Sequence, residues 1–169
     1  ARLNPTERVG AALMSNAGTL VAGAGATQQR PQRQYWEIPS VYELDFLTLN
    51  GNSTQSQNVQ IQADSDFKWT KAMFLLDVAG GAITANSIEY PKATVQIQDG
   101  GIQRNLFSAP VPVTSFFGVP GLPFILPMPY VFKARSIIQV TVASIIATNY
   151  ASLRLSFIGT RCYQGGQPQ

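Results

Sequence analysis

Apolar and polar residues alternate along much of the chain, which is the pattern of a strand with one buried face. In residues 41–49, every second side chain from Tyr42 to Phe46 is apolar, whereas Glu43 and Asp45 face the other way. Similar alternation, or a long apolar run, marks residues 57–63, 67–78, 94–98, 137–142 and 152–163. These patterns predict an all-β protein.

A long proline-rich stretch separates the strands predicted at 94–98 and 137–142. It contains six of the eleven prolines in the chain: Pro110, Pro112, Pro120, Pro123, Pro127 and Pro129. Because proline removes a backbone donor and breaks a helix interior, we expect an extended crossing with strands on either side of it rather than within it. Such a crossing is typical of Greek-key and jelly-roll topologies. The predicted fold is therefore an antiparallel β-sandwich, a jelly roll of eight or nine strands after residue 35.

Turn residues predict how neighbouring strands connect. An Asn/Gly-rich turn at 50–54 follows the first strand, so we expect residues 41–49 and 57–63 to pair as a hairpin. The turn at Asp99, Gly100 and Gly101 predicts a second hairpin, with residues 102–107 as its returning strand.

The remaining strands are placed by their apolar content. We expect the longest apolar strand, 67–78, to lie centrally in a sheet, and residues 80–92 to form a surface loop. Beyond the prolines, Arg135 and Ser136 connect residues 130–134 to the strand at 137–142. The last strand, 152–163, is predicted to direct Leu153, Leu155 and Phe157 inward and Arg154 outward.

The first 34 residues differ from the rest, because they are rich in Ala, Gly, Asn, Thr and Gln and lack strand periodicity. We interpret 1–34 as an N-terminal arm, 35–163 as the sandwich and 164–169 as a C-terminal tail. Arg2, Arg8, Arg30 and Arg33 outnumber Glu7, so the net charge of +3 belongs to the arm. An acidic partner surface would attract it. A nucleic acid or an anionic membrane would also do so, but the arginines are scattered, which favours a protein partner.

Composition points to an assembled protein. Only 12% of the 169 residues are charged, about half the usual share, which suggests that much of the surface is covered. The alternative is an ordinary secreted or viral β protein with a neutral surface rich in Gln, Asn, Ser and Thr. The length suits one domain, and no apolar run reaches the length of a membrane span. The single cysteine, Cys162, excludes an internal disulfide and is interpreted as a small buried side chain.

The residues available for chemistry argue against an enzyme. Histidine is absent, which removes the most common general base and metal ligand. The four carboxylates considered for a glycosidase or a calcium site, Asp64, Asp66, Asp77 and Asp99, are interpreted as turn residues. Asp64 and Asp66 resemble the start of a calcium loop, but its closing glutamate is missing. We therefore expect no catalytic residue, no metal, no cofactor and no small-molecule substrate.

Aromatic residues have two interpretations. They could form a sugar-binding platform, or fill the core and a subunit interface; the residues concerned are Trp36, Phe116, Phe117, Phe124, Tyr130 and Phe132. Because the adjacent rings of Phe116 and Phe117 cannot both face one core, we expect one of them to contact a partner. Trp36, Phe116, Phe117 and Tyr130 are the candidate interface residues.

The order of three motifs resembles that of a known family. A DSDF-plus-tryptophan corner (Asp64 to Trp69) is followed by the strand and turn Val95 to Asp99 and then by the run Leu122 to Val140. Over residues 35–163 the chain resembles small virion structural proteins of tailed bacteriophages, most of all the jelly-roll cement or decoration proteins of the capsid. The resemblance carries over no catalytic residue.

The resemblance implies a location and a set of partners. We expect a protein on the capsid surface of a virion that binds the major capsid protein, forms a dimer or trimer with copies of itself and stabilises the shell. No nucleic-acid or membrane partner is expected. The alternatives are another virion component, such as a tail or head-completion protein, and a carbohydrate-binding adhesin.

Overall fold

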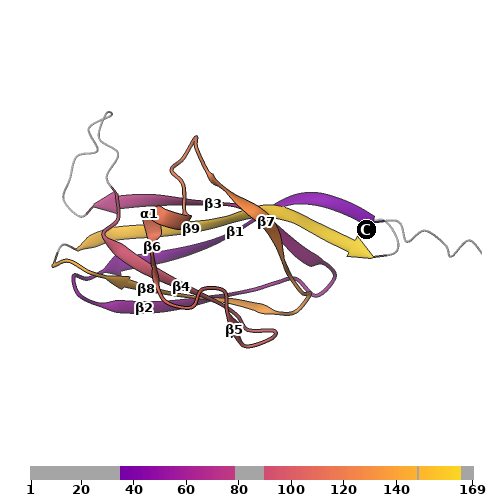
Figure 1. The fold of residues 1–169 in the computed structure, drawn as a ribbon, viewed down its shortest axis with the longest axis horizontal. Helices are drawn as coiled ribbons and strands as arrows, with labels where there is room; N and C mark the ends of the chain where they lie inside the picture. Colours follow the sequence, from indigo (N-terminus) through magenta and orange to yellow (C-terminus); the bar gives the residue numbers. More distant parts are fainter. Residues whose placement is uncertain (1–34, 79–89, 148, 165–169) are drawn as a thin grey trace, which may run out of the picture. The chain divides into compact units, whose positions relative to one another are not determined.

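The computed structural model describes residues 35–78, 90–147 and 149–164. The chain divides into two units, 1–32 and 33–169, and every described residue belongs to the second. Its elements, drawn in Figure 1, are β1 (Tyr35–Leu49), β2 (Thr54–Gln60), β3 (Asp66–Val78), β4 (Ala93–Asp99), β5 (Arg104–Asn105), β6 (Val111–Pro112), α1 (Val113–Phe116), β7 (Phe124–Phe132), β8 (Ile137–Ser144) and β9 (Tyr150–Gln164). None of the described residues belongs to a helix that is long and apolar enough to span a membrane.

The strands form two facing antiparallel sheets (Figure 1). One has the order β1-β9-β3-β7, and the other has the order β2-β8-β4-β5, with β6 also paired to β4. The pairings are nested, because β1 pairs with β9, β2 with β8, β3 with β7, and β4 with β5 and β6. These nested pairs amount to one long hairpin that is rolled up on itself. The rolling places β9 beside β3 and β8 beside β4. The topology is that of a jelly roll, as the sequence predicted.

The predicted pairing of the first two strands is wrong, because β1 and β2 belong to different sheets. Thr48 and Asn52 have positive φ angles of 53° and 52°, and the chain turns there from one sheet into the other. Glutamine side chains of β2 then reach back to the β1 backbone. Gln55 Nε2 donates to the Thr48 carbonyl at 3.1 Å, and Gln57 Nε2 donates to the Asp45 carbonyl. Hydrogen bonds therefore do link β1 and β2, but they come from side chains and join the edges of two sheets rather than the backbones of a hairpin.

The proline-rich crossing holds more structure than predicted, since β7, β6 and α1 all lie within it. β7 is an edge strand, and only one side of its backbone has a partner. Its ladder with β3 is interrupted where Trp69 pairs with Tyr130 but Lys71 pairs with Ile125. The prolines of β7 lie in this bulge, where no ladder donor is needed. Pro112 stands just before α1, where a missing N–H breaks no bond within the helix.

Other predictions are confirmed. The Asp99 turn leads into a hairpin in which Asp99 pairs with Arg104, although the returning strand β5 has only two residues. β3 lies inside its sheet, as expected for the longest apolar strand. Arg135 adopts a positive φ of 66° in the turn that carries the chain from β7 to β8. The predicted loop 80–92 lies mostly outside the described residues, as do the arm and most of the tail.

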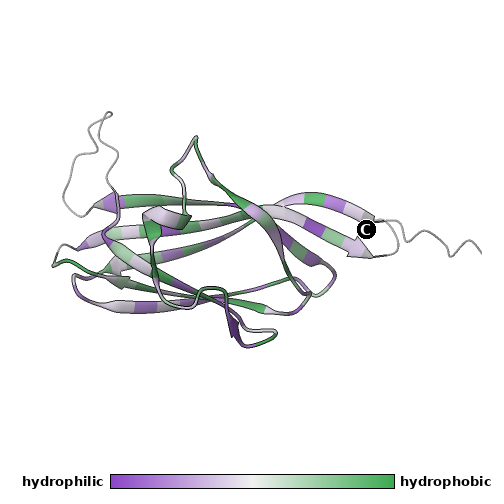
Figure 2. Ribbon diagram, in the orientation of Figure 1, coloured by the Kyte–Doolittle hydropathy of each residue, from purple (hydrophilic) through white to green (hydrophobic). Residues whose placement is uncertain are grey.

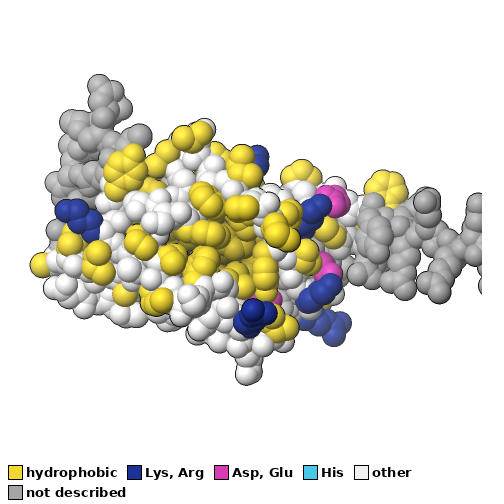
Figure 3. Space-filling view, in the orientation of Figure 1, with side chains coloured by type: hydrophobic (Ala, Val, Ile, Leu, Met, Phe, Trp, Pro, Cys, Tyr) yellow, Lys and Arg dark blue, Asp and Glu magenta, His cyan; other side chains and the backbone are white. Residues whose placement is uncertain are grey.

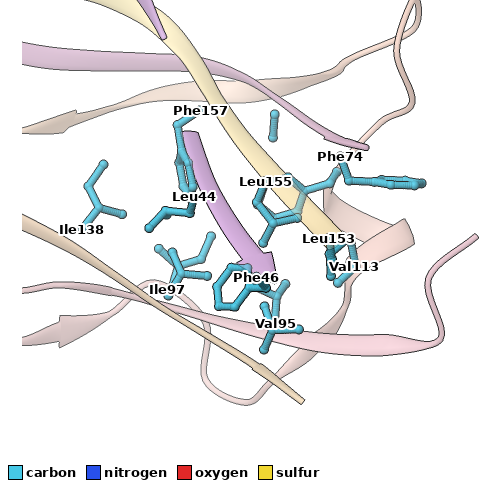
Figure 4. Packing of buried hydrophobic residues seen from close by; sticks show 14 of the residues in the cluster. Leu44, Phe46, Phe74, Val95, Ile97, Val113, Ile138, Leu153, Leu155 and Phe157 are labelled. Carbon is cyan, nitrogen blue, oxygen red and sulfur yellow. The ribbon is translucent and has the colours of Figure 1, made fainter. Parts of the chain in front are cut away.

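The core fills the space between the two sheets. Figure 2 shows hydrophobic and hydrophilic residues interspersed along the strands, and many of the hydrophobic ones belong to a single buried cluster. Leu153, Leu155 and Phe157 of β9 are fully buried, as predicted. Figure 4 shows side chains from both sheets meeting there, among them Leu44, Phe46, Val95, Ile97, Ile138, Leu155 and Phe157.

The DSDF corner ties the two sheets together at one end of the sandwich. Ser65 Oγ donates to Asp64 Oδ1 at 3.1 Å, as expected of a turn. Asp66 accepts a hydrogen bond from the backbone N–H of Ala134 at 2.9 Å and pairs with Lys133 Nζ at 2.9 Å. Both partners belong to the turn between β7 and β8. The carboxylate of Asp66 therefore fixes the start of β3 against that turn.

Candidate functional site

A hollow opens on the surface between β7 and the segment that begins with β5. Its volume is about 490 Å³, and it is lined by Trp69, Arg104, Asn105, Leu106, Phe107, Phe116, Leu126, Pro127, Met128 and Tyr130. Figure 3 shows hydrophobic side chains gathered over α1 and β7, with basic side chains near β5. We call this site the β5–β7 hollow.

The hollow exists because neither of its walls completes a sheet. On one side, the β7 bulge moves residues 126–129 out of the ladder with β3. The Trp69 indole donates to the Lys71 carbonyl at 2.7 Å and so satisfies a backbone group at the interruption. On the other side, β5 is only two residues long, although Leu106 N–H still donates to the Ile97 carbonyl at 2.9 Å. The chain then leaves the sheet and bounds the hollow.

Aromatic rings form the floor and one wall. The Phe116 ring has its centroid 5.5 Å from that of Trp69, 4.7 Å from that of Phe107 and 5.0 Å from that of Phe124. Phe116 is half-buried, whereas Trp69 is 1% exposed. Edge-to-face and tilted contacts of this kind hold the rings in fixed positions. The floor is therefore built before any partner arrives.

The adjacent rings of Phe116 and Phe117 diverge, with 70° between their planes. Phe117 is 2% exposed and packs against Phe157 in the core, at a centroid distance of 5.8 Å. It belongs to the core, and this corrects its assignment to an interface. Phe116 is the ring that reaches the hollow.

One side of the hollow is polar. The Tyr130 hydroxyl donates to Asp99 Oδ2 at 2.9 Å, and the Gly101 N–H donates to Asp99 Oδ1 at 2.8 Å. Asp99 is 4% exposed, so both oxygens of a buried carboxylate are satisfied within the fold. Arg104 and Asn105 are exposed at the rim. Asp99 thus has the turn role that the sequence predicted, and it also anchors Tyr130.

Burial raises the pKa of Tyr130 to about 12, and the hydrogen bond to Asp99 and its negative charge act in the same direction, against a smaller opposite effect of Arg104. The folded protein therefore holds this proton more tightly than the unfolded chain does. The resulting stabilisation is fully present below pH 10.0, the ordinary pKa of the group, and is lost as the pH rises to about 12.

We expect Tyr130→Phe to remove one late component from an alkaline titration of the protein. Phenolate absorbance of the wild type should contain a component near pH 12, which the variant lacks. Tyr90→Phe, at a position that is 59% exposed, is the matched control and should leave that component in place. A wild-type titration without a component near pH 12 would contradict the contact between Tyr130 and Asp99.

Four exposed apolar side chains lie along β7 and the turn before it, and one of them, Met128, also lines the hollow. Leu122, Ile125, Met128 and Val131 are 76%, 67%, 79% and 43% exposed. We call these four residues the β7 patch. Large apolar side chains exposed together along one edge of a soluble domain are typical of a binding surface.

The structure brings together only some of the predicted site residues. Phe116 and Tyr130 both line the β5–β7 hollow. Trp36 is 40% exposed but lies on β1, at the opposite edge of the sheet from β7. The arm arginines Arg2, Arg8, Arg30 and Arg33 lie outside the described residues, so their role stays a prediction.

Sequence reasoning missed Arg104, Phe107, Leu126 and Met128, which line the hollow. The one feature of the sequence that indicated the hollow was the spacing of two prolines. Pro127 and Pro129 flank Met128, and two prolines spaced in this way on an edge strand indicate a bulge with an outward-facing side chain between them. The sequence analysis interpreted these prolines only as part of an extended crossing, so the bulge was not predicted.

The described residues also bear on other kinds of site. No three His, Cys, Asp or Glu side chains are grouped so that they could hold a metal ion there. Of the six rings considered for a sugar platform, Phe117 and Phe132 are buried, Trp36 is 40% exposed, and Phe116, Phe124 and Tyr130 are half-buried, so that interpretation stays a prediction. Cys162 is half-buried, with its Sγ 4.0 Å from Thr160 Oγ1. No protein family model, curated protein or solved structure matches the chain.

Proposed function

We propose that this protein is a virion structural protein of the cement type, which binds a shell of major capsid protein at the capsid surface and stabilises it. The β7 patch is the observation that carries the proposal. Four large apolar side chains face solvent along one edge of a rigid sandwich, and a hollow with an aromatic floor lies beside them. Such a surface is suited to association with protein. The jelly roll is a fold that capsid proteins use, and the motifs of residues 35–163 resemble those of cement proteins.

Cementing needs binding rather than chemistry. A protein that binds only the assembled shell stabilises that state by mass action, and many copies on one shell add their effects. Covering each side chain of the β7 patch would contribute about 1–2 kcal/mol to such a contact. Contacts between copies of the chain, in a dimer or trimer, would add avidity without a new kind of interaction.

The arm is the second part of the proposal. Residues 1–34 carry the net charge of +3, and a groove on the shell lined with acidic side chains would attract them. The sandwich would then supply apolar contacts and the arm would supply electrostatic ones. The two contributions differ in their response to salt, because salt screens exposed charges but strengthens apolar burial.

We expect deletion of residues 1–34 to weaken binding to purified heads that lack this protein by at least about tenfold. Cosedimentation of the heads with increasing concentrations of the full chain and of the deletion measures the change. A variant with Arg2, Arg8, Arg30 and Arg33 all replaced by lysine keeps the charge and should bind nearly as well as the wild type. Replacing the same four residues by glutamine should reproduce most of the loss.

Two outcomes would count against the proposal. If the deletion binds heads as tightly as the full chain, the arm is not a tether. If the full chain does not bind heads at any salt concentration, the cement function is wrong.

A further inference from the structure

We propose that the β5–β7 hollow binds a large apolar side chain of a partner protein, and that Arg104 pairs with a carboxylate close to that side chain in the partner sequence. The inference rests on the proposed function in one respect, which is that the partner is a shell subunit. The chemistry of the site is argued from the hollow alone.

The size and lining of the hollow suit one side chain. At about 490 Å³ it lies in the range of ligand-binding clefts and has ample room for a large side chain. Trp69 and Phe116 form the apolar floor, and Leu106 and Met128 stand on opposite walls. Because ring contacts already hold the floor in place, binding of a partner side chain would cost little entropy for ordering the site.

The charge at the rim indicates what accompanies the apolar group. Arg104 takes part in none of the ion pairs found between described residues, which use Lys68, Lys133 and Arg154 as their cations. Its ladder partner Asp99 already accepts hydrogen bonds from Tyr130 and Gly101. The Arg104 guanidinium is exposed at the edge of an apolar hollow, where a carboxylate can bind it in bidentate fashion.

The shape of β7 argues against the other common way of binding a peptide at a sheet edge. A peptide that extends a sheet needs a regular row of backbone donors and acceptors. Pro127 and Pro129 lack the N–H group, and the chain around them bulges away from the ladder. Insertion of a side chain into the hollow therefore fits this edge better than addition of a strand.

A fluorescence titration of the full chain tests the site. Trp36→Phe leaves Trp69, in the floor of the hollow, as the only tryptophan of the two in the chain. The probes are N-acetyl-L-phenylalanine, which joins an aromatic ring to a carboxylate, and N-acetyl-L-phenylalaninamide, which lacks the charge. We expect the acid to change the Trp69 emission saturably, with a Kd on the order of 1 mM. The amide should bind about two- to fivefold more weakly, as for an exposed ion pair.

Variants separate the charge from the hollow. Arg104→Gln should abolish the preference for the acid, whereas Arg135→Gln, an exposed arginine outside the hollow, should keep it. Leu106→Phe narrows the hollow without adding a second tryptophan and should weaken the binding of both probes. Met128→Ala, at a position that is 79% exposed, cannot disturb the core and should weaken both probes by the same factor. Absence of any saturable response, or a preference that survives Arg104→Gln, would overturn the inference.

Binding to purified heads separates this inference from the cement function. Arg104→Gln should weaken head binding by about the same factor as it weakens the acid probe, with Arg135→Gln unchanged. If heads bind the variant and the wild type equally, a shell protein does not occupy the hollow and the inference is wrong, while the cement function stands. If the wild type binds the acid probe through Arg104 but does not bind heads, the cement function is wrong and the chemistry of the site stands.

Discussion

Replacing Phe157 by alanine should lower the free energy of unfolding by about 3–5 kcal/mol. The side chain is fully buried in the middle of β9, and its ring lies 4.8 Å from that of Trp69 and 5.8 Å from that of Phe117. Its removal leaves a cavity between the sheets that the neighbouring rings, held by their own contacts, cannot fill. Urea denaturation followed by circular dichroism measures the loss.

The control for this change is Val131→Ala, which also removes apolar atoms but from a side chain that is 43% exposed. It should cost well under half as much, because water already reaches the position. A loss below about 1 kcal/mol for Phe157→Ala would mean that the two sheets do not pack against each other as described.

The second large effect is expected at Gly159, where alanine should destabilise the fold by about 3 kcal/mol. Gly159 pairs with Trp69 at the point where the ladder between β9 and β3 shifts register. A methyl group there would overlap the Lys68 carbonyl oxygen and stand 3.0 Å from Cε2 of the buried Phe67 ring. Neither neighbour can move away easily, since one is backbone and the other is in the core.

Ala151→Ser on the same strand is the matched control, because it also adds a single heavy atom but at an exposed position. It should change the free energy of unfolding by no more than about 0.5 kcal/mol. Thermal unfolding of both variants provides the comparison. A Gly159→Ala protein as stable as its Ala151→Ser control would contradict the close approach of β9 to β3.

The sequence predicted burial well because burial follows a local pattern. Alternation in a single strand was enough to place Leu44, Phe46, Leu153 and Leu155 in the core. Strand partners are a different matter. β1 pairs with β9, so that Leu44 lies beside Leu155, and no local pattern in either segment identifies the other as its partner. The two strands nearest in sequence were therefore paired by default, whereas they lie in different sheets.

The candidate site was predicted only in part, for a related reason. Phe116 and Tyr130 were among the aromatic residues predicted for an interface, and both line the hollow. Arg104 lies on a hairpin strand whose sequence has no feature of a binding site. It lines the hollow only because the β7 bulge leaves space opposite it. Pro127 and Pro129 indicate the bulge on one side, but the hollow between two incomplete edges is a property of the packed chain that no single local pattern encodes.

The pairing of β1 with β9 also bears on how the protein is made. β9 lies between β1 and β3, so the strand of this sandwich that is translated last is an interior strand of its sheet. Until it arrives, β1 and β3 each lack a neighbour and present unpaired backbone groups to other nascent chains. The sandwich can therefore close only after translation has passed residue 164. A product that terminates before β9 would be prone to aggregate.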